Sequence, residues 1–175
     1  DYEYVVLSRD KAEFYDANLK PIKKDLVNID WNASAAEKDG YPDFMLKEIY
    51  EQPDLIKKWN DIYFEQNLLT KLPEIQNFKK IHIVGCGTAY HAGLVGKYLL
   101  EQYCNTEVQV FIASEYRYQK LFVDKDTLVI AISQSGETAD TLACLKRVKK
   151  YEAHTIGIVN VPDSSIARLV DEVIY

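Results

Sequence analysis

Hydroxyl-bearing residues and glycines gather directly after two apolar runs of β type. The first run ends at Gly85 and leads into Gly87 and Thr88, and the second leads into the loop Ser133–Thr138, which reads SQSGET. A helical pattern begins after each loop. The first turn of a helix has up to four N–H groups without intrahelical partners, and the helix dipole adds partial positive charge there. Two such loops predict an anion site, and a phosphate group suits it.

The side chains of the two loops supply further contacts. Thr88 is expected to cap the first helix with its hydroxyl, and Gly87 permits close approach of the backbone to a ligand. The second loop adds three hydroxyls and one amide. The residues predicted for the phosphate site are therefore Gly87, Thr88, Ser133, Gln134, Ser135 and Thr138. Glu137 is expected to bind N–H groups of its own loop and not the phosphate.

From Lys80 onward, apolar β-type runs alternate with helical patterns, which predicts an α/β fold with a mostly parallel, doubly wound sheet. Strands are expected near 81–85, 107–112, 127–132, 155–159 and 172–175. In the flavodoxin-like order 2-1-3-4-5, the first and third strands are neighbours at the switch point, where ligands bind beyond the carboxyl ends of strands. These are the two strands that precede the loops, so the half-sites are expected to converge.

Helices must connect these strands and cover the sheet. The first, over 89–103, is expected to turn seven residues toward the sheet: Ala89, Ala92, Gly93, Gly96, Leu99, Leu100 and Tyr103. The next, over 138–150, is expected to bury Leu142, Leu145 and Val148. Because the chain ends within or just after the fifth strand, where such a fold continues into another helix, we expect it to be a piece of a longer protein.

The pattern of apolar and polar residues divides the chain into four segments. Residues 1–30 contain short β elements, near 4–7, 13–15 and 26–29, and 31–40 form an irregular linker. Residues 41–79 are expected to form two helices, the first ended by Pro53. The main α/β domain occupies 80–175.

Composition excludes several classes of protein. With 47% hydrophobic and 27% charged residues the chain is typical of a globular protein, and no apolar run approaches the ~18 residues of a membrane span. A net charge of -6 disfavours nonspecific binding to nucleic acid. Three cysteines without a CxxC pair indicate neither a disulfide framework nor a zinc site, and they favour a reducing, cytoplasmic setting. No cofactor and no metal are predicted.

Nucleotide sites are weakly supported. A dinucleotide loop needs GxGxxG, but Tyr90 occupies the third glycine position, and no Walker A sequence is present. Cys86 and His91 lie close to the first loop, and a structural role is favoured for both over a catalytic one. Ser164 and Ser165 are expected to cap a short helix ending near Arg168, and a contribution of this third loop to the site is left open.

Four segments carry a specific resemblance to a known family. WNASAAEKDGYPDFMLKEIYEQP, GCGTAYHAG, SQSGETADTL and IVNVPDSSIAR are similar to the sugar isomerase (SIS) part of glutamine:fructose-6-phosphate aminotransferases, which make glucosamine 6-phosphate. The resemblance covers essentially the whole chain, and residues 1–30 resemble the end of that family's glutaminase domain. It implies a three-layer αβα fold, a homodimer and binding of fructose 6-phosphate or glucosamine 6-phosphate through the predicted phosphate residues.

The resemblance also implies limits on activity. The family's cysteine nucleophile would precede residue 1, and its ring-opening and isomerising residues would follow Tyr175, so no catalytic residue is assigned and the chain alone is expected to be inactive. The family reads CGTS where this chain has Ala89, and a missing hydroxyl costs roughly 1.5 to 3 kcal/mol against a charged group. A stand-alone SIS module that senses phosphosugars and a flavodoxin-like nucleotide module remain as alternatives.

Overall fold

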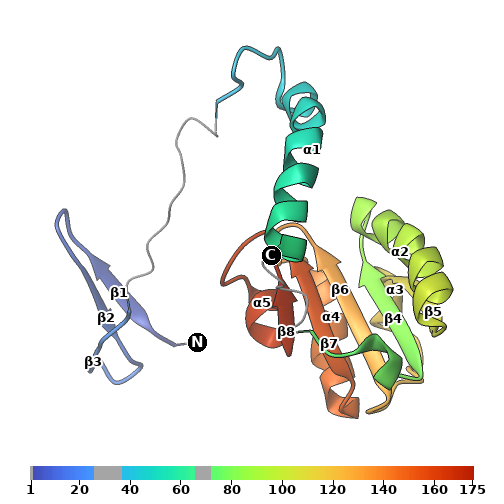
Figure 1. Cartoon of the computed structure of the whole chain (residues 1–175). Helices are drawn as coiled ribbons and strands as arrows, with labels where there is room; N and C mark the ends of the chain where they lie inside the picture. The colour runs from blue at the N-terminus through green and yellow to red at the C-terminus, as the bar shows by residue number, and fades with distance from the viewer. Residues whose placement is uncertain (1, 26–36, 66–71) are drawn as a thin grey trace. The chain divides into compact units, whose positions relative to one another are not determined.

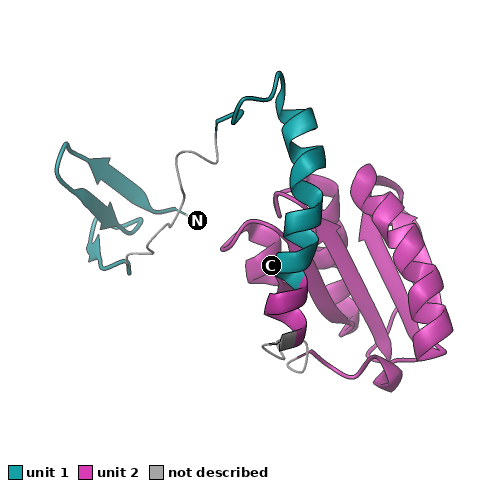
Figure 2. Cartoon of the chain, turned by 45° about the horizontal axis from the view of Figure 1, so that its top comes forward, with its two compact units in different colours: residues 1–59 teal, residues 60–175 magenta. Residues whose placement is uncertain are grey.

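The structure is a computed structural model that describes residues 2–25, 37–65 and 72–175. The chain forms two compact units, residues 1–59 and 60–175, which are coloured separately in Figure 2. Within the described residues, no helix is long and apolar enough to cross a membrane.

The first unit begins with a small antiparallel sheet of three strands. These are β1 (Tyr4–Leu7), β2 (Ala12–Tyr15) and β3 (Pro21–Ile22), with β2 in the centre. The first two strands confirm the predicted β elements, whereas β3 was not predicted. The third predicted element, 26–29, and most of the predicted linker lie outside the described residues.

Helix α1 (Phe44–Asn60) follows, and Pro53 lies inside it. The predicted break into two helices at Pro53 is therefore wrong. An interior proline removes one backbone hydrogen bond and costs about 3 kcal/mol relative to alanine. Good helix formers on both sides continue the helix past it, including Glu48 and Glu51 before the proline and Leu55 after it. A π-helical turn, η2 (Asp61–Glu65), follows directly.

The second unit is built on a five-stranded parallel sheet (Figure 1). Its strands are β4 (Lys80–Gly85), β5 (Glu107–Ile112), β6 (Thr127–Ser133), β7 (His154–Val159) and β8 (Glu172–Ile174). Their order is β5-β4-β6-β7-β8, which is the predicted order 2-1-3-4-5. A short 3-10 turn, η4 (Ile75–Asn77), precedes β4.

Helices lie on both faces of the sheet, as the prediction of an α/β fold requires. Helix α2 (Thr88–Cys104) covers β4 and β5 on one face. The other face carries α3 (Ala113–Tyr116), α4 (Ala139–Val148) and α5 (Ser165–Leu169), and a 3-10 turn, η5 (Lys149–Tyr151), extends α4. The alternation of side chains along β4 separates the two cores: Val84 belongs to the core beneath α4, whereas Ile81 and Ile83 belong to the opposite core.

Helix α2 contacts the sheet along a narrower stripe than predicted. Gly93 is buried and Leu100 is half-buried, but Ala92, Leu99 and Tyr103 are exposed, so their predicted inward orientation is wrong. The small residues allow close approach: a Cβ on Gly93 would lie 2.9 Å from Cγ2 of Ile83 and 3.0 Å from Cγ1 of Val110. Helix α4 buries Leu145 and Val148 fully and packs Leu142 against the same core, as predicted.

Helix α3 was not predicted, and it places a large polar side chain in the core. Tyr116 is 1% exposed, and its hydroxyl lies 2.8 Å from Nδ1 of His82 on β4. Burial lowers the pKa of His82 to about 4, because the desolvated ring resists protonation, and a weaker contribution comes from nearby Lys80.

The lowered pKa of His82 makes stability depend on pH. The unfolded chain binds a proton at its ordinary pKa of 6.5, whereas the folded chain does not until about pH 4. Stability from this group is therefore present above pH 6.5 and is lost as the pH falls through this window. We expect the free energy of unfolding to fall by about 2 kcal/mol between pH 7 and pH 5 from this group.

Urea denaturation at several pH values checks this expectation in His82→Gln, with His91→Gln on the exposed surface of α2 as control. His82→Gln should flatten the pH profile between pH 5 and pH 7, whereas His91→Gln should leave it unchanged. A profile of equal steepness in His82→Gln and in the unchanged chain would contradict the assignment.

Candidate functional site

The two predicted loops begin at the same edge of the sheet. Strands β4 and β6 are parallel neighbours, and their register pairs Val84 with Ala131. Each strand ends within two residues of this pair, so the loops after Gly85 and Ser133 leave the sheet side by side at its carboxyl edge (Figure 1). The predicted convergence of the two half-sites follows from this register.

The first loop offers backbone N–H groups to a ligand, and no side chain caps helix α2. Gly87 is the N-cap of α2 with φ of 56°, a conformation that favours glycine, and a Cβ there would meet no atom within 4 Å. Thr88 is the first residue of α2, so its predicted role as the N-cap is wrong. Its side chain is exposed. Gly87 and Thr88 thus bring backbone N–H groups and one hydroxyl to the surface.

The buried hydroxyl of Ser133 organises the second loop. Its Oγ accepts the N–H of Gly136 at 3.1 Å and lies 2.9 Å from Oγ1 of Thr138. Thr138 is the N-cap of α4, yet its side chain makes no capping hydrogen bond. The first turn of α4 therefore keeps backbone donors that the cap does not use.

Ser135 and Gln134 lie closer to solvent than Ser133. Ser135 is half-buried, and its Oγ accepts the N–H of Glu137 at 3.2 Å, which leaves the hydroxyl hydrogen available to an acceptor. The side chain of Gln134 is exposed, while its backbone carbonyl accepts the N–H of Asn160 at 3.1 Å. All six predicted residues therefore belong to two neighbouring loops, with Ser133 in a bracing position and the others nearer the surface.

A third loop, after β7, forms hydrogen bonds to the second loop, and these bonds are called the brace. Ser164 caps α5, as predicted, by accepting the N–H of Ala167. The N–H of Ile166 donates to the carbonyl of Gly136 at 2.9 Å, and the N–H of Ser165 donates to Oε1 of Glu137 at 2.7 Å. Glu137 therefore binds the next loop and not its own, which corrects the prediction.

These bonds from Ser165 lower the pKa of the Glu137 carboxyl below its usual range. The Glu137 carboxylate is therefore charged at neutral pH and is held by its hydrogen bond to the third loop. Sequence reasoning missed this brace, although the Ser164-Ser165 capping signal marked the loop. No local pattern indicates which carboxylate an N–H group of that loop will meet.

The two other candidate residues near the site, Cys86 and His91, contact other parts of the fold. Cys86 is half-buried and packs against the core beneath α4, and His91 is exposed with its ring 5.4 Å from that of Tyr90. In the described ranges no group of three His, Cys, Asp or Glu side chains is placed to hold a metal ion. An anion at this edge would therefore meet hydroxyls, amides and two helix N-termini.

Comparison with known proteins agrees with this fold. Residues 74–175 match the SIS domain family. An isomerizing glutamine–fructose-6-phosphate aminotransferase of Clostridium tetani is 48% identical over the whole of this chain, and one of Thermus thermophilus is 40% identical. The chain spans 30% of the length of each of these relatives.

Two solved structures share the fold. The C-terminal domain of glucosamine-fructose-6-phosphate aminotransferase from Francisella tularensis superposes with a TM-score of 0.66 at 40% identity, covering 78% of this chain and 40% of that one. A glucosamine-6-phosphate deaminase from Thermotoga maritima superposes with a TM-score of 0.64 at 27% identity, covering 74% and 39%. With more than half of its length matched by the family and the three-layer α/β fold in place, the chain belongs to the SIS domain family.

Proposed function

We propose that this chain is the phosphosugar-binding part of a glutamine:fructose-6-phosphate aminotransferase, an enzyme that converts fructose 6-phosphate and glutamine to glucosamine 6-phosphate and glutamate. The observation that carries the proposal is the pair of loops at the carboxyl ends of β4 and β6, where hydroxyls lie beside helix N-termini. The relatives named above support the choice of enzyme. The part they share with this chain is less than a third of their length.

In this proposal each residue has a specific role. The phosphate accepts backbone N–H groups from the first turns of α2 and α4 and hydroxyl hydrogens from Thr88, Ser135 and Thr138. Ser133 holds the second loop in shape, and Gln134 donates its amide from the rim. The chain binds the sugar phosphate without turning it over, as a homodimer in the cytoplasm, and the groups for ring opening and ammonia transfer belong to other parts of the enzyme.

Loss of the Ser135 hydroxyl tests the site directly. Ser135→Ala is expected to weaken binding of fructose 6-phosphate about tenfold, because a hydrogen bond to a charged group contributes about 1.5 to 3 kcal/mol. Isothermal calorimetry measures the dissociation constant. Ser8→Ala is the control, since that hydroxyl bonds the carbonyl of Lys11 in the turn between β1 and β2. Equal affinities in Ser135→Ala and the unchanged chain would remove Ser135 from the site.

A hydroxyl restored at position 89 should have the opposite effect. Ala89 lies in the first turn of α2, half-buried beside Gly85, so Ala89→Ser adds a donor at the edge where the phosphate is proposed to bind. We expect about tenfold tighter binding of fructose 6-phosphate in the same calorimetric titration. Ala92→Ser, exposed one turn later on α2, serves as control. Unchanged affinity in Ala89→Ser would contradict the proposed position of the phosphate.

The alternatives predict different ligands. A phosphosugar sensor would bind the same hexose phosphates without belonging to an aminotransferase, and the reading frame on both sides of these 175 residues distinguishes the two. A flavodoxin-like nucleotide module would bind FMN or a nucleotide in preference to fructose 6-phosphate. Titration of FMN beside the sugar phosphate separates that module from the proposal.

A further inference from the structure

Three side chains on one face of α4 bind α3 and the residue that follows it. Asp140, Cys144 and Arg147 recur at helical spacing, which places them on the same side of α4. Sγ of Cys144 donates to the carbonyl of Ala113 at 3.1 Å, and Nη1 of Arg147 donates to the carbonyl of Arg117 at 2.9 Å. Arg117, which follows α3 directly, is therefore held beside α4.

The side chain of Arg117 forms an ion pair with Asp140, the acidic residue in the first turn of α4. Nη1 of Arg117 donates to Oδ1 of Asp140 at 2.6 Å, and the guanidinium lies over the ring of Tyr118 at 4.9 Å. The two charged side chains are 33% and 35% exposed. The pair is thus fixed by its neighbours and still lies within reach of ions in solution.

Asp140 carries its charge close to the place proposed for the phosphate. Its own backbone N–H is one of the donors in the first turn of α4 that lack an intrahelical partner. A phosphate oxygen bonded to this N–H would lie no more than roughly 7 Å from the Asp140 carboxylate, because one hydrogen bond and four covalent bonds separate them. Like charges at that separation repel each other, more strongly at a protein surface than in bulk water. An unpaired Asp140 would therefore oppose the binding of a phosphate.

Two other carboxylates belong to neighbouring segments. Glu137 accepts the N–H of Ser165 at 2.7 Å as part of the brace. Glu115 on α3 is exposed, so solvent and salt screen its charge. Asp140 is half-buried and stands within the turn that offers the donors. It is therefore the carboxylate at which the presence or absence of one cation, that of Arg117, should have the largest effect on an anion.

We infer that Arg117 is a positioning residue for the proposed phosphate site. It pairs with Asp140, cancels the negative charge in the first turn of α4, and so lets a phosphate reach the backbone N–H groups there. Arg117 follows β5, so a third strand of the sheet contributes to the site beside β4 and β6. The inference rests on the proposed function, because it concerns the same anion site.

Two single variants that break the same ion pair should change binding in opposite directions. Arg117→Gln leaves the Asp140 carboxylate unpaired and is expected to weaken fructose 6-phosphate binding about three- to tenfold. Asp140→Asn leaves the Arg117 cation unpaired and is expected to strengthen binding by a similar factor. A merely structural contact would make binding weaker in both. Isothermal calorimetry at low ionic strength measures the dissociation constants, and weaker binding in both variants, or no change in either, would overturn the inference.

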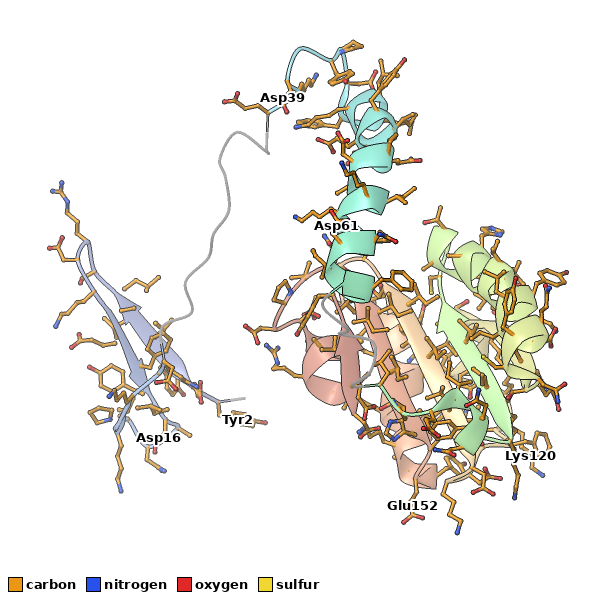
Figure 3. The ribbon with its side chains drawn as sticks, viewed as in Figure 1. Tyr2, Asp16, Asp39, Asp61, Lys120 and Glu152 are labelled. Atoms are coloured by element: carbon orange, nitrogen blue, oxygen red, sulfur yellow. The ribbon has the colours of Figure 1, made fainter. Side chains whose placement is uncertain are left out.

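A second ion pair of α4 supplies a matched control. Lys149 pairs with Asp171, and these side chains are also 33% and 35% exposed. Figure 3 shows Glu152, directly after η5, at the amino-terminal ends of the strands, opposite the proposed site. Lys149→Gln removes the same charge as Arg117→Gln and should leave fructose 6-phosphate binding unchanged. Equal weakening by both would make net charge the cause and overturn the inference.

Two further measurements identify the effect as electrostatic. The double variant Arg117→Gln/Asp140→Asn carries neither charge, so it should bind fructose 6-phosphate more tightly than Arg117→Gln and less tightly than Asp140→Asn. The difference between the two single variants should also shrink in about 0.5 M salt, which screens charges over a few ångströms. A double variant no better than Arg117→Gln, or a difference that salt leaves unaltered, would contradict a role through charge.

Inorganic phosphate separates this inference from the proposed function. Titrated into the whole ¹⁵N-labelled chain and followed by NMR at the amides of 139–141, phosphate should bind Arg117→Gln more weakly and Asp140→Asn more tightly than the unchanged chain. If fructose 6-phosphate failed to bind while phosphate followed this order, the proposed function would be wrong and the inference would stand. If fructose 6-phosphate bound all three chains equally, the inference alone would be wrong. No phosphate shifts at these amides would overturn both.

Discussion

Replacing Gly136 with alanine is expected to lower the free energy of unfolding by about 3 to 4 kcal/mol and to abolish the proposed binding of fructose 6-phosphate. Gly136 has φ of 66°, and a Cβ there would lie 2.0 Å from Oγ and 2.4 Å from Cβ of Ser164. Both the backbone conformation and the packing thus exclude a side chain. To accept the methyl group, the second loop must move away from the third, which breaks the bond from Ile166 to the Gly136 carbonyl.

Gly87 is a control that separates the cost of backbone strain from the cost of steric overlap. Gly87 also has a positive φ, of 56°, but a Cβ there meets nothing within 4 Å. Gly87→Ala should therefore lose less than Gly136→Ala, about 1 to 3 kcal/mol, from backbone strain alone. Urea denaturation followed by circular dichroism measures both variants. If Gly136→Ala were no less stable than Gly87→Ala, the contact between the second and third loops would not limit the loop's conformation.

Gly93→Val is expected to cost about 3 kcal/mol or more in unfolding free energy. Gly93 is the buried point of contact between α2 and the sheet, and a Cβ at this position would press on Ile83 and Val110 at 3.0 Å or less. Valine adds two further methyl groups in the same space. Because both neighbours are side chains of a close-packed core, relief requires α2 to shift outward.

Gly96, one turn further along α2, provides the control. A Cβ there would lie 3.8 Å from Cδ1 of Ile83, an ordinary contact, so Gly96→Ala should raise stability by up to about 1 kcal/mol through helix propensity. Thermal and urea unfolding of the two variants should thus move in opposite directions. A stable Gly93→Val chain would show that α2 does not depend on close approach at this residue.

The sheet was the part of the fold that the sequence predicted best, for a physical reason. Strands buried on both faces, such as Thr127–Ser133, read as continuous apolar runs, and parallel crossovers restrict the order in which they can be arranged. Helix α3 has only four residues and no periodic pattern to reveal it. The break at Pro53 was predicted from a local cost, which the rest of a 17-residue helix outweighs.

The position of the two loops was predictable from the sequence, but the hydrogen bonds within and between them were not. Glycines and hydroxyls after strands marked both loops, and the register of β4 with β6 explains why they meet. Ser133 is buried and Gln134 is exposed, and this difference depends on which side chains face the interior once the loop has formed. The partner of Glu137 comes from 28 positions further along the chain, a separation at which local patterns carry no information.

The brace between the second and third loops has a consequence for measurements of motion. Three backbone amides of the third loop region, those of Asn160, Ser165 and Ile166, donate to acceptors in the segment Gln134–Glu137. Their protons can exchange with solvent deuterium only when the two loops separate. The exchange rates of these three amides therefore report the opening of the proposed phosphate loop from outside it, and a ligand that holds the loop closed should slow all three together.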